Sequence, residues 1–380
     1  MAAFRPNGAF DRRDVICGGG AAAFATLVAS LLAGGRPARA VGLESPAPTV
    51  DKVSVTVVTD SYMLAVAPNL TIGDVEIQRS GFMLSDLPPA RALVSEFGLS
   101  LHVESLRGPE ARRVLIDFGY TPEALNNNLE LLRLDPAALD ALILSHGHYD
   151  HFGGLVGFLK AHGAKLRANL PLYLGGEECF CSREWKAPPT KGNFGALDRR
   201  ALEQAKLAVT YAEGASLVAG HGFTTGQVEL GSFEKVLAPT AMTIGVTDGV
   251  GCYADKLPQD ERTLTVISDQ FRHEIATAYN LRGRGLIILT SCSHRGVVNV
   301  VKQAQTVSGE NKVHAIIGGF HLAPQKEDYV RETVAALKAI DPDYIIPMHC
   351  TGDAFFDIAK VEMPGKVLRS YTGTRFVFSA

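Results

Sequence analysis

The first half of the chain has the alternating and short apolar patterns that are typical of β-strands. Hydrophobic and polar residues alternate over residues 53–59 and again over residues 98–104, and this two-residue period predicts half-buried strands. Residues 113–119 and 141–144 form short apolar runs of the kind that is buried within a sheet. Between these two runs, residues 122–134 carry apolar side chains at helical spacing. We therefore predict a β-rich half that contains one helix.

The second half of the chain repeats a strand followed by a helix. The pattern predicts strands over 285–290, 313–317 and 344–346 and helices over 296–308 and 327–340, with a turn and a short helix after the last strand. Strands that alternate with helices indicate a sheet covered by helices, so the predicted fold class is α/β. Residues 176–200, which include the only Trp, are predicted to form a loop. Such a loop either covers an active site or is a plain surface excursion.

The first 40 residues have the features of an export signal. The pair Arg12-Arg13 precedes a weakly apolar run over residues 15–35, and Ala38-Arg39-Ala40 gives the segment an A-x-A cleavage pattern at its end. The adjacent arginines favour the twin-arginine type. The alternative is an uncleaved anchor helix, but each glycine in the run would destabilise that helix by about 1 kcal/mol.

We expect the signal to be cleaved at or near Val41, which leaves no stable membrane anchor in the mature protein. The twin-arginine translocation machinery would be a partner during export, and the protein would be periplasmic or secreted. Residues 41–51, rich in Pro and small residues, are predicted to be a linker. Residues 52–380 are predicted to form the folded domain.

Composition and charge narrow the class of partner. Of the 380 residues, 46% are hydrophobic and 20% are charged, which is ample material for a large core. The formal net charge is −3, and the first 40 residues contribute five Arg against two Asp, so the remaining chain is more acidic still. A domain with net negative charge attracts neither the phosphates of nucleic acid nor the headgroups of anionic lipids. We therefore expect a small-molecule substrate and no nucleic acid.

Residues 41–380 contain five cysteines, at positions 179, 181, 252, 292 and 350. An odd number without a regular spacing predicts at most one or two disulfides. The spacing of Cys179 and Cys181 alone is too weak a motif to indicate a metal site.

The segment after the predicted strand 141–144 carries the strongest chemical signal. His146, His148, Asp150 and His151 fall within six residues. So many polar side chains cannot enter a core unpaired, because each unsatisfied group costs about 1–3 kcal/mol. A Gly between two His lets the backbone turn so that both imidazoles face one point, while the Asp and the next His face a second point. Imidazole and carboxylate suit Zn²⁺, with iron or manganese as alternatives.

Three more histidines follow predicted strands in the second half. His294, His321 and His349 each come just after a strand end, where ligands gather in layered α/β folds. One His in such a place is usually a hydrogen-bonded loop residue, but three of them in a chain with the H-x-H-x-D-H cluster favour a shared metal site. His102, His162, His221 and His314 are predicted to be structural or surface residues.

These segments resemble the metallo-β-lactamase superfamily. The H-x-H-x-D-H cluster carries the resemblance, and the Asp117-Phe118-Gly119 end of the run 113–119 is similar to the superfamily's Asp-x-Gly. Phe97-Gly98-Leu99 and the segments around His294, His321 and His349 resemble a branch that includes the archaeal dihydropterin–ribofuranosylaminobenzene phosphate synthase. The resemblance covers nearly all of residues 52–378. It implies an αββα sandwich with the metal site at one edge of the two sheets.

The resemblance also implies how the ligands divide. His146 and His148 would share one metal ion, Asp150 and His151 would face a second ion completed by His349, and His294 is our choice for the remaining His ligand. In many superfamily hydrolases an Asp at the end of one strand bridges the two ions. The comparable residues of this chain, 289–292, contain no carboxylate, so the chain departs from the family pattern at this point. The bridge is either absent or supplied by Asp269 or His321, with His273 and Glu274 as weaker candidates.

Three functions of different classes follow. The first is a hydrolase in which a metal-activated water or hydroxide attacks an ester, lactone, amide or phosphoester, with Asp150 orienting the nucleophile and His321 as a second proton carrier. The second is a transferase similar to the named synthase, but its pterin-type substrates are cytoplasmic, which the export signal argues against. The third is a non-catalytic, metal-dependent binding protein. Zinc, as two ions, is the expected cofactor.

Overall fold

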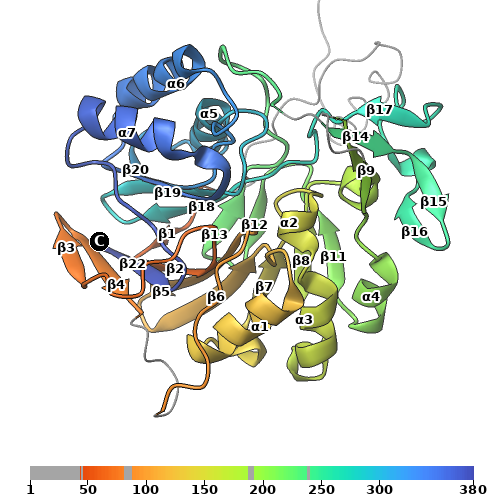
Figure 1. Cartoon of the computed structure of the whole chain (residues 1–380), viewed down its shortest axis with the longest axis horizontal. Coiled ribbons are helices and arrows are strands. Elements are labelled where there is room, and N and C mark those ends of the chain that lie inside the picture. Colours follow the sequence, from red (N-terminus) through yellow and green to blue (C-terminus); the bar gives the residue numbers. More distant parts are fainter. Residues whose placement is uncertain (1–42, 44–45, 81–87, 187–191, 238–239) are drawn as a thin grey trace, which may run out of the picture. The chain divides into compact units, whose positions relative to one another are not determined.

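The computed structural model describes residues 43, 46–80, 88–186, 192–237 and 240–380. The predicted export signal lies outside these residues. The described residues belong to one compact unit, and within it two large β-sheets lie face to face between two layers of helices (Figure 1). The predicted αββα sandwich is therefore confirmed.

In the described part of the chain, the larger sheet has nine strands in the spatial order β11-β8-β7-β6-β5-β2-β22-β4-β3. These strands are β2 (Lys52–Thr59), β3 (Leu70–Ile72), β4 (Val75–Arg79), β5 (Ser100–Arg107), β6 (Glu110–Ile116), β7 (Ala141–Ile143), β8 (Pro171–Leu174), β11 (Ala208–Tyr211) and β22 (Thr374–Ser379). On its outer face lie α1 (Pro122–Leu131), α2 (Tyr149–Phe152) and α3 (Leu155–His162).

The second sheet has seven strands among the described residues, in the order β12-β13-β18-β19-β20-β21, with β1 beside β18. These strands are β1 (Thr49–Val50), β12 (Ser216–Val218), β13 (Gly222–Thr224), β18 (Thr277–Leu281), β19 (Gly285–Thr290), β20 (Val313–Gly318) and β21 (Tyr344–Pro347). Helices α5 (Val297–Ser308), α6 (Glu327–Ile340) and α7 (Asp353–Glu362) cover its outer face.

The core explains why these segments form these elements. Strands β19 and β20 are buried along their whole length, because the other sheet covers one face and helices cover the other. Their near-continuous apolar sequences are typical of parallel strands buried on both faces. Helix α6 instead buries only Val330, Thr333, Val334 and Leu337, which recur every three to four residues on one side.

Parallel pairing brings several strand ends together. β6 runs parallel to β7 in one sheet, and β19, β20 and β21 run parallel in the other. The carboxyl ends of parallel strands meet at the same edge of a sheet. The segments that follow these strands carry Asp117, His146, His294, His321 and His349, so the topology gathers them at one edge of the sandwich.

Most predicted elements are present, with small differences at their ends. The helix predicted over 122–134 ends at Leu131, because Arg133 adopts a left-handed backbone conformation with φ of 56°. The segment predicted as a linker contains β1, so its last residues are part of the second sheet. Within the described residues, no helix is both long and apolar enough to cross a membrane.

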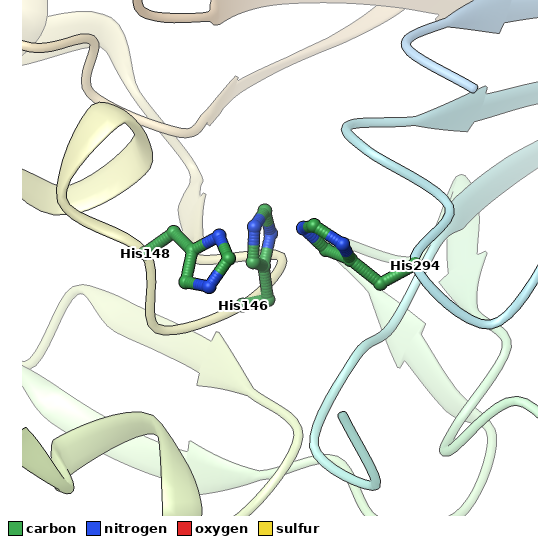
Figure 2. A group of neighbouring side chains, drawn as sticks. All are labelled: His146, His148 and His294. Carbon is green, nitrogen blue, oxygen red and sulfur yellow. The ribbon is translucent and has the colours of Figure 1, made fainter. Parts of the chain in front are cut away.

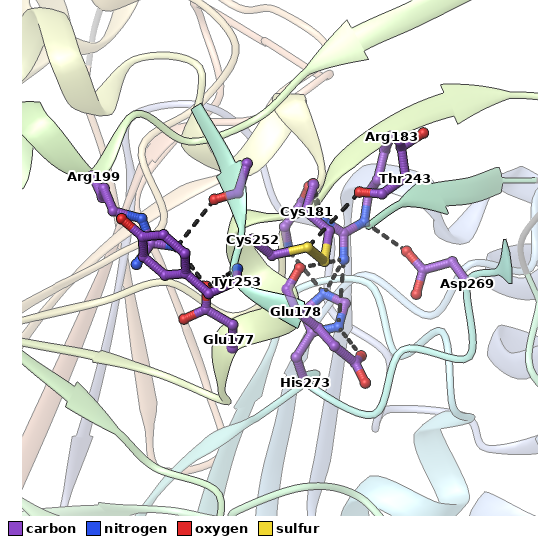
Figure 3. Close-up of a disulfide and its surroundings, with 12 residues drawn as sticks. Glu177, Glu178, Cys181, Arg183, Arg199, Thr243, Cys252, Tyr253, Asp269 and His273 are labelled. Carbon is purple, nitrogen blue, oxygen red and sulfur yellow. Dashed lines mark hydrogen bonds and ion pairs between the residues drawn. A yellow bond between two sulfur atoms is a disulfide. The ribbon is translucent and has the colours of Figure 1, made fainter. Parts of the chain in front are cut away.

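The prediction of a loop over residues 176–200 is wrong. The described part of this segment contains β9 (Ser182–Trp185), β10 (Gly192–Gly195) and the start of α4 (Arg199–Gln204). β9 pairs with β10 and with β14 (Thr240–Thr243), which also pairs with β17 (Val266–Ser268). A disulfide joins Cys181, just before β9, to Cys252 at the end of β16 (Val250–Cys252), which pairs with β15 (Gly245–Thr247) (Figure 3).

Candidate metal centre

The H-x-H-x-D-H segment bends from a strand end into a short helix. β7 ends at Ile143, His146 and His148 lie in the following turn, and α2 begins at Tyr149 with Asp150 and His151 in its first turn. His146 and His151 are fully buried. The segment therefore holds its polar side chains inside the protein, as a ligand cluster would.

Three histidines form the first ligand set. One ring nitrogen each from His146, His148 and His294 lies within 4.8 Å of the other two. Figure 2 shows their rings turned toward a common point, with His294 reaching it from the segment after β19. His146 and His148 follow a strand of the larger sheet, and His294 follows a strand of the second sheet. The set therefore forms only when the two sheets are packed together.

Each of these imidazoles is held through one nitrogen. His294 Nδ1 donates to the Leu237 carbonyl at 2.9 Å, and His146 Nδ1 lies 2.9 Å from Ser145 Oγ. His148 Nε2 lies 3.3 Å from Thr240 Oγ1. The Nε2 atoms of His146 and His294 are buried without any hydrogen-bond partner. A buried ring nitrogen with no partner is destabilising unless a metal ion accepts its lone pair, and such ions prefer imidazoles oriented through the other nitrogen.

Burial also keeps the first ligand set neutral. Burial, followed by the charges of neighbouring histidines, lowers the pKa of His146 well below its usual range. Burial has the same effect on the pKa of His148 and of His294. Neutral imidazole is the form that binds metal ions, so the three side chains are ready to coordinate at neutral pH.

The second ligand set contains a carboxylate. Asp150 Oδ2 lies 3.5 Å from His151 Nε2 and 3.2 Å from His349 Nε2. His349 Nδ1 lacks a hydrogen-bond partner, and the His349 ring stacks on Phe97 at 4.8 Å between centroids. Its backbone N–H donates to Asp60 at 2.9 Å, which fixes the turn after β21. The set has two imidazoles and a carboxylate, a combination that suits zinc or iron.

Electrostatics distinguish this set from the first. Burial alone would lower the pKa of His151, but the carboxylates of Asp150 and Asp117 raise it to about 10. Burial favours the neutral form of Asp150, but His151 and His349 outweigh it and hold the pKa of Asp150 well below its usual range. In the metal-free chain His151 is therefore protonated, and a metal ion must displace that proton when it binds.

Asp117 supports both ligand sets. It lies after β6 in a left-handed conformation with φ of 58°. One carboxylate oxygen accepts from the Ser145 backbone N–H, and the other accepts from Ser145 Oγ and lies 2.8 Å from His151 Nδ1. Since Ser145 also contacts His146, the Asp-x-Gly motif orients one ligand of each set.

His321 lies beside the first set. Its ring centroid is 4.3 Å from that of His294, and its Nδ1 has no hydrogen-bond partner. The residue adopts a left-handed φ of 49° and is only partly buried. A Cβ on Gly318 would lie 1.6 Å from the Thr290 carbonyl oxygen, so only glycine lets the two strand ends come this close.

Asp269 and its neighbours His273 and Glu274, considered above as candidates for the bridge, have other partners in the structure. Asp269 is fully buried in an ion pair with Arg183, at 2.6 Å between Nε and Oδ2. His273 Nδ1 contacts Glu178 at 2.9 Å, and Glu274 accepts the backbone N–H groups of His294 and Arg295. All three candidates are therefore engaged in other interactions, and Asp269, one of the alternatives left open for the bridge, is paired with Arg183.

The role expected for Gly147 also differs. Its backbone is not left-handed, but a Cβ there would lie 2.4 Å from Arg183 Nη1. Arg183 is fully buried, and its guanidinium donates to the carbonyl oxygens of Gly147, Cys181 and Glu178 (Figure 3). Gly147 therefore leaves space for Arg183, which supports the turn that carries His146 and His148. The sequence around Gly147 gave no indication of this contact.

Two cysteines inside the cluster were also missed. Cys292 Sγ lies 3.2 Å from His151 Nε2 and 3.4 Å from Cys350 Sγ, and both cysteines are buried and free. Their positions beside His294 and His349 in the sequence were the signal that could have identified them.

The four histidines that were predicted to be structural or surface residues lie outside the ligand sets, and three of them have partners elsewhere. His162 contacts Asn126, His221 contacts Ser105 and Glu110, and His314 contacts Asp343. His102 is buried in β5, and burial lowers its pKa to about 4. These positions agree with the prediction that the four histidines are structural or surface residues.

Comparisons with known proteins agree with this geometry. A family model described as the metallo-beta-lactamase superfamily matches residues 105–256. The chain is 32% identical over 262 residues to the 7,8-dihydropterin-6-methyl-4-(beta-D-ribofuranosyl)-aminobenzene-5'-phosphate synthase of Methanocaldococcus jannaschii, which covers 68% of this chain and 82% of that protein. An uncharacterised protein of the same organism is 28% identical over 247 residues, or 63% of this chain and 80% of that protein.

A solved structure supports the fold in particular. Tm1679, described as a metal-dependent hydrolase of the beta-lactamase superfamily, aligns with a TM-score of 0.60 at 21% identity. The alignment covers 85% of this chain and 98% of that one.

Proposed function

Because the chain belongs to the metallo-β-lactamase superfamily, an enzyme superfamily whose fold implies bound metal, we propose that it is a metal-dependent hydrolase. The observation that carries this proposal is the meeting of two ligand sets at one edge of the sandwich, where the buried Nε2 atoms of His146 and His294 have no protein partner. The substrate would be a small molecule with an ester, lactone, amide or phosphoester bond.

The two sets would hold two zinc ions. His146, His148 and His294 would hold one ion, and Asp150, His151 and His349 the other. Bound there, the metal supplies hydroxide at neutral pH and polarises the scissile bond. Asp117 holds Nδ1 of His151 and Ser145 holds Nδ1 of His146, so Nε2 is the nitrogen of each ring that would bind metal.

Asp150 and His321 are the proposed proton carriers. The Asp150 side chain is 14% exposed, whereas the side chains of His151 and His349 beside it are fully buried. Asp150 would orient the nucleophile and pass a proton to the leaving group. His321 is more exposed than the five histidine ligands, and its Nδ1 has no hydrogen-bond partner, which suits a second proton carrier.

The substrate would have an apolar part. Phe97 is 58% exposed beside His349, and Phe194 lies 5.6 Å from His148 between ring centroids. Two aromatic rings at the sides of a polar cluster provide apolar contact while the polar groups fix orientation.

A second candidate is a transferase similar to the archaeal synthase, and the 32% identity favours it. This candidate requires a pterin-type substrate to reach the enzyme. The proposed export of this chain argues against that, and a single assay with the synthase's substrates distinguishes the two functions. A non-catalytic, metal-dependent binding protein is the remaining alternative, which bound metal without turnover would support.

The test combines metal analysis with a substrate panel. We expect the purified protein to contain about two zinc ions and to hydrolyse at least one ester, lactone, amide or phosphoester, with chelator abolishing and zinc restoring the activity. His148→Ala should lose about one metal equivalent and nearly all turnover, because two remaining protein ligands bind zinc weakly.

His162→Ala is the matched control, since this histidine lies outside the cluster on α3. Wild-type metal content in His148→Ala would contradict the ligand assignment. A metal-loaded protein that is inactive on the whole panel would contradict the hydrolase.

A further inference from the structure

Cys292 lies between the two ligand sets. Its Sγ is within 4.8 Å of a ring nitrogen of His146 and of His151, one from each set. It is also within 4.8 Å of donor atoms of His294 and His321 in a second group and of His349 and Cys350 in a third. The side chain is only 2% exposed. A thiol in this position meets the donors of both sets at once, as a ligand between two metal ions would.

The distances agree with ligands of a common ion. Zn–S bonds of about 2.3 Å and Zn–N bonds of about 2.0–2.1 Å place the two donors of a tetrahedral ion roughly 3.5 Å apart. Cys292 Sγ and His151 Nε2 are 3.2 Å apart. A small adjustment would let one ion bind both atoms.

The backbone explains why two neighbouring side chains both enter the cluster. Ser293 lies between Cys292 and His294 with a left-handed φ of 56°. Ser293 Oγ donates to the Gly319 carbonyl and contacts Thr290 Oγ1, so its own side chain is held among backbone groups. The turn therefore directs Cys292 and His294 into the site together.

We propose that Cys292, as a thiolate, is a metal ligand that takes the place of the missing bridging carboxylate. This inference rests on the proposed metal centre. On binding, the S–H bond breaks, the proton passes to solvent and an S–metal bond forms, with no change in oxidation state. Thiolate is a soft ligand, so its presence selects zinc over manganese or magnesium.

Cys350 is the neighbour that must be distinguished from Cys292. Its thiol donates to Cys292 Sγ at 3.4 Å, and its own Sγ accepts the His321 backbone N–H at 3.3 Å. Both contacts place Cys350 as a hydrogen-bonding neighbour of the thiolate.

Cobalt spectroscopy of the whole protein tests the proposal. After chelation and loading with Co²⁺, the wild type should show visible d–d bands and a near-ultraviolet thiolate-to-cobalt charge-transfer band. Cys292→Ser should lose the charge-transfer band and keep the d–d bands. Its affinity for Zn²⁺ should fall at least about tenfold, because even a residue that only hydrogen-bonds to a metal ligand typically contributes that much to affinity. Cys350→Ser and Cys179→Ala should keep the band, since Cys179 packs among apolar side chains.

The outcomes separate this proposal from the proposed function. Bound Co²⁺ without a charge-transfer band in the wild type would overturn Cys292 ligation and leave the hydrolase intact. No Co²⁺ binding at all would overturn the metal centre itself. A band lost in Cys350→Ser but kept in Cys292→Ser would assign the ligand to the other cysteine and overturn the proposal.

Zinc-edge X-ray absorption of the wild type gives a measurement that needs no variant to fold. A sulfur scatterer at about 2.3 Å supports the proposal, and a shell of only nitrogen and oxygen overturns it.

Discussion

At the scale of single residues, the site is prepared for metal before metal binds. His294 is held by the Leu237 carbonyl and His146 by Ser145, and the Nε2 atom of each is buried without a hydrogen-bond partner. The protein therefore accepts unpaired nitrogens in its interior, which lowers the stability of the metal-free fold. Metal binding returns that free energy, so metal and folding are thermodynamically linked.

His321 and His349 should respond differently to truncation. His349→Ala should lose about one metal equivalent together with turnover, because it removes a ligand of the second set. His321→Ala should keep its metal and lose about 10²–10⁴ in kcat, the usual range for a positioned acid–base group. The measurements are the metal-to-protein ratio and kcat on the best substrate of the panel.

Other outcomes for His321 are equally definite. Loss of one metal equivalent in His321→Ala would make it a ligand beside His294, and unchanged kcat would make it a bystander. Either result contradicts a role as proton carrier.

The sequence identified the seven predicted polar residues at strand ends because each lies in a local pattern: a strand, then His or Asp. It could not decide the bridge. Asp269 is held by Arg183, a partner 86 residues away in the sequence, and such a contact leaves no local signal. Cys292 was missed for a related reason, since only the turn at Ser293 places its side chain beside that of His294.

At the scale of elements, the small sheet of strands β10, β9, β14 and β17 supports the turn that carries His146 and His148. β9 was not predicted because its sequence is short and charged, and its pairing with β14 joins segments far apart in the chain. Arg183 is buried in β9 only because Asp269 neutralises it. A strand that depends on a distant ion pair cannot be found from hydrophobic periodicity alone.

Arg183 is therefore expected to position the metal ligands. Arg183→Lys keeps the charge opposite Asp269 but removes the planar fork that contacts the Gly147 carbonyl. We expect zinc affinity to fall about 10–100-fold, as for other groups that orient metal ligands. Unfolding free energy should fall by about 1–3 kcal/mol, because buried carbonyls lose their donors. Chelator competition and urea unfolding measure the two effects.

Arg200→Lys is the control, since Arg200 is about half exposed on α4 and pairs with Asp198. If Arg183→Lys lowers stability but binds zinc as tightly as the wild type, Arg183 stabilises the small sheet without positioning the ligands.

At the scale of the whole molecule, the two sheets must be packed before the site exists, because each contributes ligands. The Cys181–Cys252 disulfide adds to this by closing a loop with a sequence separation of 71, worth roughly 4 kcal/mol in a chain-entropy account. Disulfides persist in oxidising compartments. This favours the export that the N-terminal sequence predicts.

Export through the twin-arginine route is the last prediction. Arg12→Lys with Arg13→Lys should leave the protein in the cytoplasm, because that machinery recognises the paired arginines. Arg5→Lys with Arg36→Lys, which changes two arginines outside the pair, should be exported normally. Fractionation followed by N-terminal sequencing should find periplasmic protein that begins at or near Val41. Periplasmic protein that still begins at Met1 would contradict cleavage, and normal export of the Arg12/Arg13 variant would contradict the route. Wild-type protein that stays in the cytoplasm would contradict export itself and would reopen the transferase, since the cytoplasmic substrates would then be within reach.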